Sequence, residues 1–201
     1  MGNDMKRFLI GALLAAATFG ANAEILDISV GDNSFRGAFA GPLARMISGT
    51  NGQYDVGVTL RPRTNDDLLQ LHAGVLLTGD AGAKSLDVAA GLGVRAIYTG
   101  RDNDSGGALA LGGQFETRVP SYNRFGFTGY GYYAPGVMSF GNVESYQEVG
   151  VALDYELIRG GTVYVGYRNI KQELPNLGVG ATGSSKQTTD NGAHIGFRLK
   201  F

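Results

Sequence analysis

The chain has 201 residues and a formal net charge of −1, which fits one domain and excludes a strongly basic nucleic-acid-binding protein. It contains no Cys and no Trp, so disulfide bonds, thiolate catalysis and cysteine metal sites are excluded. Glycine is abundant at 33 residues, while 17% of residues are charged and 10% are aromatic, a composition that favours strands and turns over a disordered linker.

The first segment has the three parts of a secretory signal peptide. Two basic residues precede an apolar run at residues 8–19, and residues 21–23 (ANA) form a small-residue cleavage site. The run is too short to span a bilayer as a helix, and no later stretch reaches the roughly 18 apolar residues that a spanning helix needs. We therefore expect residues 1–23 to be removed on export and residues 24–201 to form one barrel domain.

The rest of the chain alternates between apolar residues and polar or small residues, with the two-residue period of β-strands. The pattern predicts ten strands, at residues 24–30, 34–43, 54–61, 69–78, 86–98, 109–119, 125–133, 148–157, 163–169 and 192–201. Turn-forming residues such as Gly, Pro, Asn and Asp separate these strands. The alternative is a barrel of eight strands, because alternation is weaker in residues 24–51 and leaves open whether they form barrel strands.

A soluble barrel and a membrane barrel would both alternate in this way, so strand length and the polar face decide between them. Several runs match the 9–11 residues of a tilted membrane strand, whereas a mean soluble strand has about 5–6. Glycines such as Gly57, Gly91 and Gly150 share the polar face with long charged side chains, which suits a narrow interior. Short and long connections alternate, as in outer-membrane barrels. We therefore expect an all-β protein, an antiparallel transmembrane β-barrel with its apolar face toward lipid.

The charged residues of the polar face are then predicted to form a network inside the barrel. Six acidic and six basic side chains belong to it: Asp55, Arg61, Asp87, Arg95, Glu116, Arg118, Glu148, Asp154, Glu156, Arg168, Arg198 and Lys200. An unpaired charge in a narrow interior is costly, so we expect these charges to pair. A barrel of about eight strands has an interior just wide enough for side chains to fill, so the expected interior is narrow.

Three segments resemble the YfaZ-like outer-membrane proteins of Gram-negative bacteria: residues 132–140 (YYAPGVMSF), 163–170 (VYVGYRNI) and 194–201 (HIGFRLKF). The resemblance covers most of the chain after residue 23. It implies an outer-membrane β-barrel, exported through the periplasm, and supplies no catalytic residues. The terminal Phe201 resembles the C-terminal signal read by the barrel-assembly machinery. The implied partners are that machinery during biogenesis, outer-membrane lipid and lipopolysaccharide.

From these patterns we expect a structural or interaction barrel with a side-chain-filled lumen, and not an enzyme. The alternative is a porin-like pore for small solutes or ions. A third hypothesis is a lipid-modifying barrel enzyme that uses His194 with an acidic residue. However, neither His194 nor His72 has a Ser or Asp at a spacing that indicates a catalytic triad. Two His residues without a third ligand pattern predict no metal site, and no cofactor or nucleic-acid partner is expected.

Overall fold

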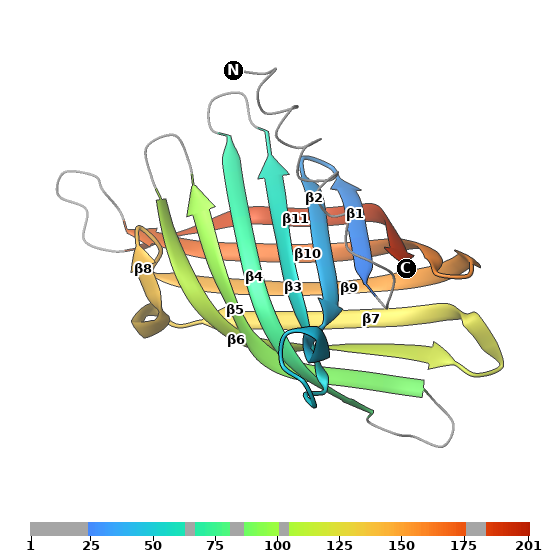
Figure 1. The fold of residues 1–201 in the computed structure, drawn as a ribbon. Helices are drawn as coiled ribbons and strands as arrows, with labels where there is room; N and C mark the ends of the chain where they lie inside the picture. Colours follow the sequence, from blue (N-terminus) through green and yellow to red (C-terminus); the bar gives the residue numbers. More distant parts are fainter. Residues whose placement is uncertain (1–23, 63–66, 81–86, 101–104, 176–183) are drawn as a thin grey trace.

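The computed structural model describes residues 24–62, 67–80, 87–100, 105–175 and 184–201. The predicted signal peptide, residues 1–23, lies outside the described residues. The described strands are β1 Ile25–Gly31, β2 Phe35–Pro42, β3 Gly52–Arg61, β4 Leu68–Asp80, β5 Asp87–Gly100, β6 Ser105–Val119, β7 Tyr122–Ala134, β8 Ser139–Gly141, β9 Ser145–Ile158, β10 Gly161–Pro175 and β11 Ser184–Lys200. Two 3-10 turns, η1 Leu43–Arg45 and η2 Gly136–Met138, complete the elements (Figure 1). Among these residues no helix is long and apolar enough to cross a bilayer.

Ten of the described strands close into an antiparallel barrel. Strands β1 to β7 pair in chain order, β7 pairs with β9, and β9, β10 and β11 follow. Strand β11 then pairs with β1, aligning Lys200 with Ile25 and His194 with Gly31. The seam extends past both strands, because the backbones of Glu24 and Phe201 exchange two hydrogen bonds of 3.0 Å. The prediction of a ten-stranded antiparallel barrel is confirmed, and the eight-stranded alternative is wrong.

The remaining strand, β8, continues the barrel wall where β7 stops. Strand β7 ends at Ala134, and Pro135 follows, which has no N–H to donate to a ladder. After the turn η2, β8 pairs with residues Gly106 to Ala108 of β6, next to the part of β6 that pairs with β7. The wall between β6 and β9 is therefore built from two segments of chain.

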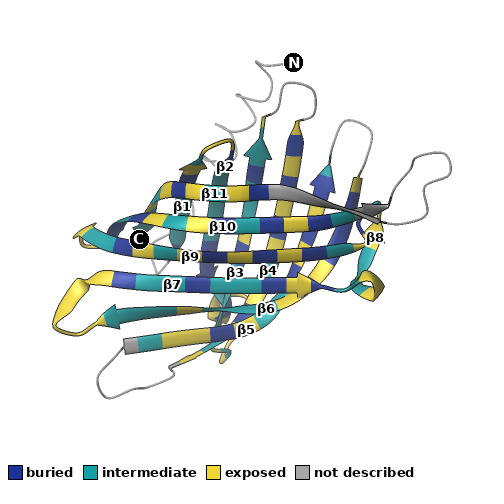
Figure 2. Ribbon diagram, turned by 180° about the vertical axis from the view of Figure 1, so that it is seen from behind, coloured by how far each residue is buried: buried dark blue, intermediate teal, exposed yellow. Residues whose placement is uncertain are grey.

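Side chains alternate between the inside and the outside of the barrel along each strand. In β9, Val149, Val151 and Leu153 are exposed, whereas Glu148 before them and Asp154 after them are buried. Figure 2 shows this alternation as buried and exposed bands along β9 and β10. Such a pattern requires one face of the sheet to point into a closed interior.

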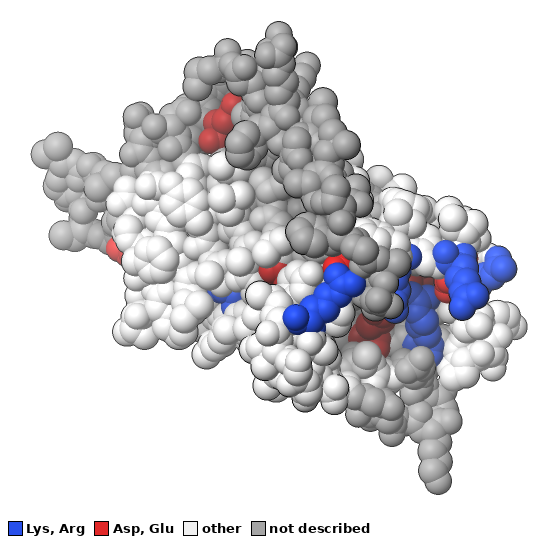
Figure 3. Space-filling model, in the orientation of Figure 1, with Lys and Arg blue, Asp and Glu red and all other residues white. Residues whose placement is uncertain are grey.

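The outward-facing side chains form an apolar wall. Leu92 is 76% exposed and Ile195 is 65% exposed, and on the face seen in Figure 3 most of the described surface carries no charge. Aromatic residues stand near the strand ends, with Tyr98 and Phe140 at one end and Phe125 at the other. An apolar band flanked by aromatic residues is the outer surface of a membrane barrel. A soluble monomer rarely exposes a contiguous apolar area of this extent.

Strands β10 and β11 are longer than the sequence pattern predicts. The predicted strands end at residue 169 and resume at residue 192, whereas β10 runs to Pro175 and β11 starts at Ser184. A register shift between Ile170 and Lys171 interrupts the ladder, and backbone pairing then continues through polar residues. Polar residues in this part of the hairpin hide the two-residue hydrophobic period, while the backbone hydrogen bonds continue regardless of side-chain type.

Candidate functional site in the barrel interior

A network of ion pairs around Glu148 crosses the interior of the barrel. The Glu148 carboxylate on β9 accepts a hydrogen bond of 3.0 Å from Arg36 on β2, and one of 3.3 Å from Arg95 on β5. It also accepts a 2.7 Å bond from the hydroxyl of Tyr146. Strands β1, β11 and β10 separate β2 from β9, and β6 and β7 separate β5 from β9. Glu148 therefore joins walls of the barrel that are not neighbours in the sheet.

The second carboxylate of this central network belongs to Asp55 on β3. Its Oδ2 lies 2.9 Å from Nη2 of Arg95 and 3.2 Å from Nε2 of His72 on β4. His72 in turn lies 3.4 Å from Nη2 of Arg36, which closes a ring of contacts through Glu148. The guanidinium of Arg95 also stacks 3.8 Å from the ring centroid of Tyr132. All members of this ring are buried to at least 88% in their side chains.

Glycines make room for these long side chains. A Cβ added to Gly57 would stand 2.4 Å from the ring of His72, and one added to Gly74 would stand 2.5 Å from Asp55 Oδ1. Both glycines are the direct cross-strand neighbours of the side chain that covers them. Gly196 is covered in the same way by a tyrosine of β10 at 2.2 Å. The interior is therefore close-packed around its polar groups, and added carbon atoms have no space.

Further ion pairs line the interior on the side of the chain termini. Arg118 near the end of β6 lies 3.0 Å from Asp154 on β9 and 3.1 Å from Glu116 on its own strand. Arg198 on β11 lies 3.2 Å from Asp27 on β1. Asp154 is buried, the two arginines and Asp27 are partly exposed, and Glu116 is 43% exposed, so this group reaches the mouth of the barrel.

A third group of polar contacts joins the turn between β1 and β2 to strands β10 and β11. The Nε of Arg168 donates a 2.8 Å hydrogen bond to Asp190, and its Nη2 donates one of 3.3 Å to Ser34. The hydroxyl of Ser34 also donates a 3.2 Å hydrogen bond to Asp190. The side chains of all three residues are buried, which makes their mutual pairing necessary in a low-dielectric interior.

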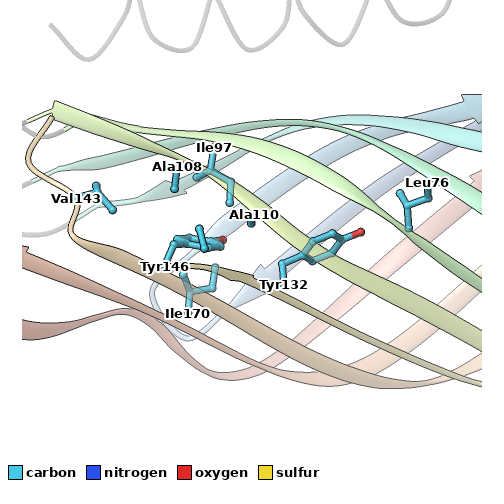
Figure 4. Packing of buried hydrophobic residues seen from close by; sticks show 9 residues of the cluster. Leu76, Ile97, Ala108, Ala110, Tyr132, Val143, Tyr146 and Ile170 are labelled. Atoms are coloured by element: carbon cyan, nitrogen blue, oxygen red, sulfur yellow. The ribbon is translucent and has the colours of Figure 1, made fainter. Parts of the chain in front are cut away.

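An apolar layer lies beside the central network, toward the end opposite the termini. Ile97, Ala108, Tyr146 and Ile170 belong to one buried cluster with Val143, and Figure 4 shows Tyr146 and Ile170 lying side by side. These residues come from β5, β6, β9, β10 and the segment before β9. These inward-facing side chains fill part of the interior at this level, and the hydroxyl of Tyr146 is already bonded to Glu148.

The twelve residues predicted for the network occupy different environments. Asp55, Arg95 and Glu148 meet in the central ring, and Glu116, Arg118 and Asp154 meet near the mouth. Arg168 and Arg198 pair with carboxylates outside the predicted set, and Glu156 accepts a 3.3 Å hydrogen bond from the backbone N–H of Gly160. Arg61 is partly buried at the end of β3, and Lys200 is exposed at the end of β11. Asp87 begins β5, and its side chain is outside the described part of the structure.

Sequence reasoning missed Arg36, Asp27 and Asp190, which complete the pairing. Arg36 and Asp27 lie on the first two strands, where a charge between apolar neighbours is the same signal used elsewhere. Asp190 lies just before the predicted start of the last strand. Strands were predicted at residues 24–30 and 34–43, and assigning their charged residues to the polar face would have included the first two.

The described interior does not assemble a catalytic group around His194. The ring of His194 packs edge-on against Tyr164 at 5.8 Å between centroids, and its Nδ1 is buried without a hydrogen-bond partner among the described residues. A triad requires the base to contact both a nucleophile and an orienting acid. Within the described residues no group of three or more His, Asp or Glu is placed to hold a metal ion.

A closed antiparallel barrel with an apolar outer wall and a paired, charged interior defines a transmembrane β-barrel protein. The model of the YfaZ precursor family matches residues 50–201. The chain therefore belongs to the YfaZ family, as the sequence resemblance predicted.

Comparison with solved structures finds other barrels. The KdgM porin in complex with disordered oligogalacturonate is similar at 8% identity, over 90% of this chain and 99% of the porin, with a TM-score of 0.39. The translocator domain of the autotransporter NalP from Neisseria meningitidis is similar at 12% identity, over 100% of this chain and 96% of that domain, with a TM-score of 0.30. No curated protein matches the chain.

Proposed function

We propose that this chain is an outer-membrane β-barrel protein with a closed interior and a structural or interaction role. The observation that carries the proposal is the Glu148 carboxylate, which binds Arg36 and Arg95 from strands well apart in the barrel. Family membership and the predicted signal peptide support export to the outer membrane. The apolar outer wall supports a permanent place in a bilayer.

The central network opposes the passage of solutes for an energetic reason. A solute on the barrel axis would have to displace buried, charge-assisted hydrogen bonds, and breaking one buried ion pair costs about 3–5 kcal/mol. The paired charges also leave little net field to select cations or anions. We therefore expect low conductance with weak ion selectivity.

Planar-bilayer recording of the refolded chain without residues 1–23 tests this proposal. The wild type should give rare, small conductance steps, and the double variant Arg95→Ala/Glu148→Ala should give larger and more frequent steps because its constriction is removed. The outer-wall variant Leu92→Ala serves as the control and should behave as the wild type. A large, steady wild-type conductance would refute the closed interior.

The porin-like alternative is favoured by one specific observation. Thr59 Oγ1, Gln70 Oε1 and the Tyr132 hydroxyl are buried and have no hydrogen-bond partner among the described residues. Buried polar atoms of this kind normally bind internal water. If the recordings show conductance that the Arg95→Ala/Glu148→Ala variant leaves unchanged, a water path along these atoms replaces the closed interior as the working hypothesis.

A further inference from the structure

The outer wall of the barrel has an apolar hollow that the interior network does not explain. It has a volume of about 460 Å³ and is lined by residues of β6, β7, β9, β10 and β11, among them Phe125, Phe127, Tyr155, Val165 and Ile195. Phe127 aligns with Leu153, and Val165 with Ile195, so its wall follows rows of cross-strand neighbours. The hollow lies on the half of the barrel nearer the chain termini.

One polar atom in this wall lacks a partner. The hydroxyl of Thr117, which lines the hollow, is buried and makes no hydrogen bond to any described residue. Thr117 aligns with Phe127, which aligns with Leu153, so this sealed hydroxyl lies in the row of the hollow farthest from the β9–β10 turn. Thr117 lies two residues before the end of β6, which corresponds to a depth of about 7 Å along the strand.

The rim of the hollow at the same end is basic. Arg159 lies in the turn between β9 and β10, four residues and about 13 Å along the strand from Tyr155 in the hollow. Arg124 directly precedes Phe125, and both arginines are exposed. Figure 3 shows Lys and Arg atoms, with a smaller number of Asp and Glu atoms beside them, near the right-hand edge, where Figure 1 places the C-terminus and the β9–β10 turn.

We propose that this hollow binds one anionic phospholipid from the membrane leaflet on the side of the chain termini. An acyl chain occupies the apolar hollow, and Arg159 faces the negative headgroup. The apolar hollow and the basic turn beyond it follow the order of acyl chain and headgroup in a lipid. The inference concerns the outer wall and rests only on the barrel standing in a bilayer, not on whether its interior conducts.

Native mass spectrometry of the refolded barrel in a neutral detergent tests the proposal. The probes are dimyristoyl phosphatidylglycerol, which is anionic, and dimyristoyl phosphatidylcholine, which is zwitterionic. The wild type should retain one phosphatidylglycerol molecule in preference to phosphatidylcholine. Arg159→Gln should reduce that preference about fivefold, since one cation beside an anionic lipid surface contributes about 1 kcal/mol.

Three further variants separate the hollow from the rest of the wall. Val165→Trp should fill the hollow and lower retention of both lipids at least fivefold, whereas Leu92→Trp, on the outer face of β5, should leave retention unchanged. Thr117→Val should leave retention of both lipids unchanged, because the Thr117 hydroxyl is sealed from the hollow by its neighbours. Heat-modified gel mobility verifies that each variant is folded.

Several outcomes would overturn the proposal. The first is equal retention of the two lipids by the wild type, and the second is a Val165→Trp variant that retains lipid as the wild type does. The third is a dimer peak that Val165→Trp abolishes, because this result would assign the hollow to a second copy of the chain. Strong conductance with selective lipid retention would refute the closed interior alone, and poor conductance without retention would refute the lipid site alone.

Discussion

Replacement of Glu148 by Gln removes the charge that holds the central network together while keeping the shape of the side chain. In the native barrel Glu148 is 1% exposed and accepts hydrogen bonds from Arg36, Arg95 and Tyr146. After the change Arg95 still pairs with Asp55, but Arg36 loses the only carboxylate that the described contacts give it. Removing one partner of a buried ion pair costs about 3–5 kcal/mol, so we expect a loss of that size.

The matched control is Glu116→Gln, because Glu116 also pairs with an arginine but is 43% exposed. An exposed ion pair contributes about 0–1 kcal/mol, so this variant should be close to the wild type. Urea unfolding in detergent micelles, followed by heat-modified gel mobility, gives the free energy of unfolding for both. In the double-mutant cycle with Arg36→Ala, the two residues should couple by at least about 1 kcal/mol. Equal, small losses for Glu148→Gln and Glu116→Gln would refute the interior network as a source of stability.

Three other predictions test the wall, the packing and the assembly of the barrel. Spin labels at Ile195 and Arg198 should differ strongly in accessibility to a lipid-soluble relaxant, and equal accessibility would contradict the membrane orientation. Gly196→Ala should destabilise the barrel by about 1–3 kcal/mol in urea unfolding, since the added Cβ would stand 2.2 Å from a tyrosine ring, whereas Gly79→Ala, with nothing within 4 Å, should not. Deletion of Phe201 should lower the outer-membrane yield measured by cell fractionation, and a normal yield would show that its backbone bonds at the seam are dispensable.

The sequence by itself determined the strands and the faces they present. The hydrophobicity of a strand has a two-residue period wherever one face meets an apolar environment and the other meets polar groups. Strands β4, β5, β9 and β11 could therefore be predicted from alternation. The same alternation assigns Val151 and Ile195 to the exposed face and Glu148 to the buried face, as the structure has them. Strand number followed from the count of these segments together with the turns between them.

The partners of each interior charge were decided only by the tertiary structure. Glu148 and Arg36 are 112 residues apart, and alternation says that both face inward but not that their strands stand across the interior from each other. That placement depends on strand order and on the closure of β1 against β11, which bring distant segments to one level of the barrel. The outer hollow has the same origin, because its wall combines five strands whose side chains meet only after the sheet has curved and closed. A local pattern fixes which face a side chain occupies, whereas its neighbours across the interior depend on the geometry of the whole sheet.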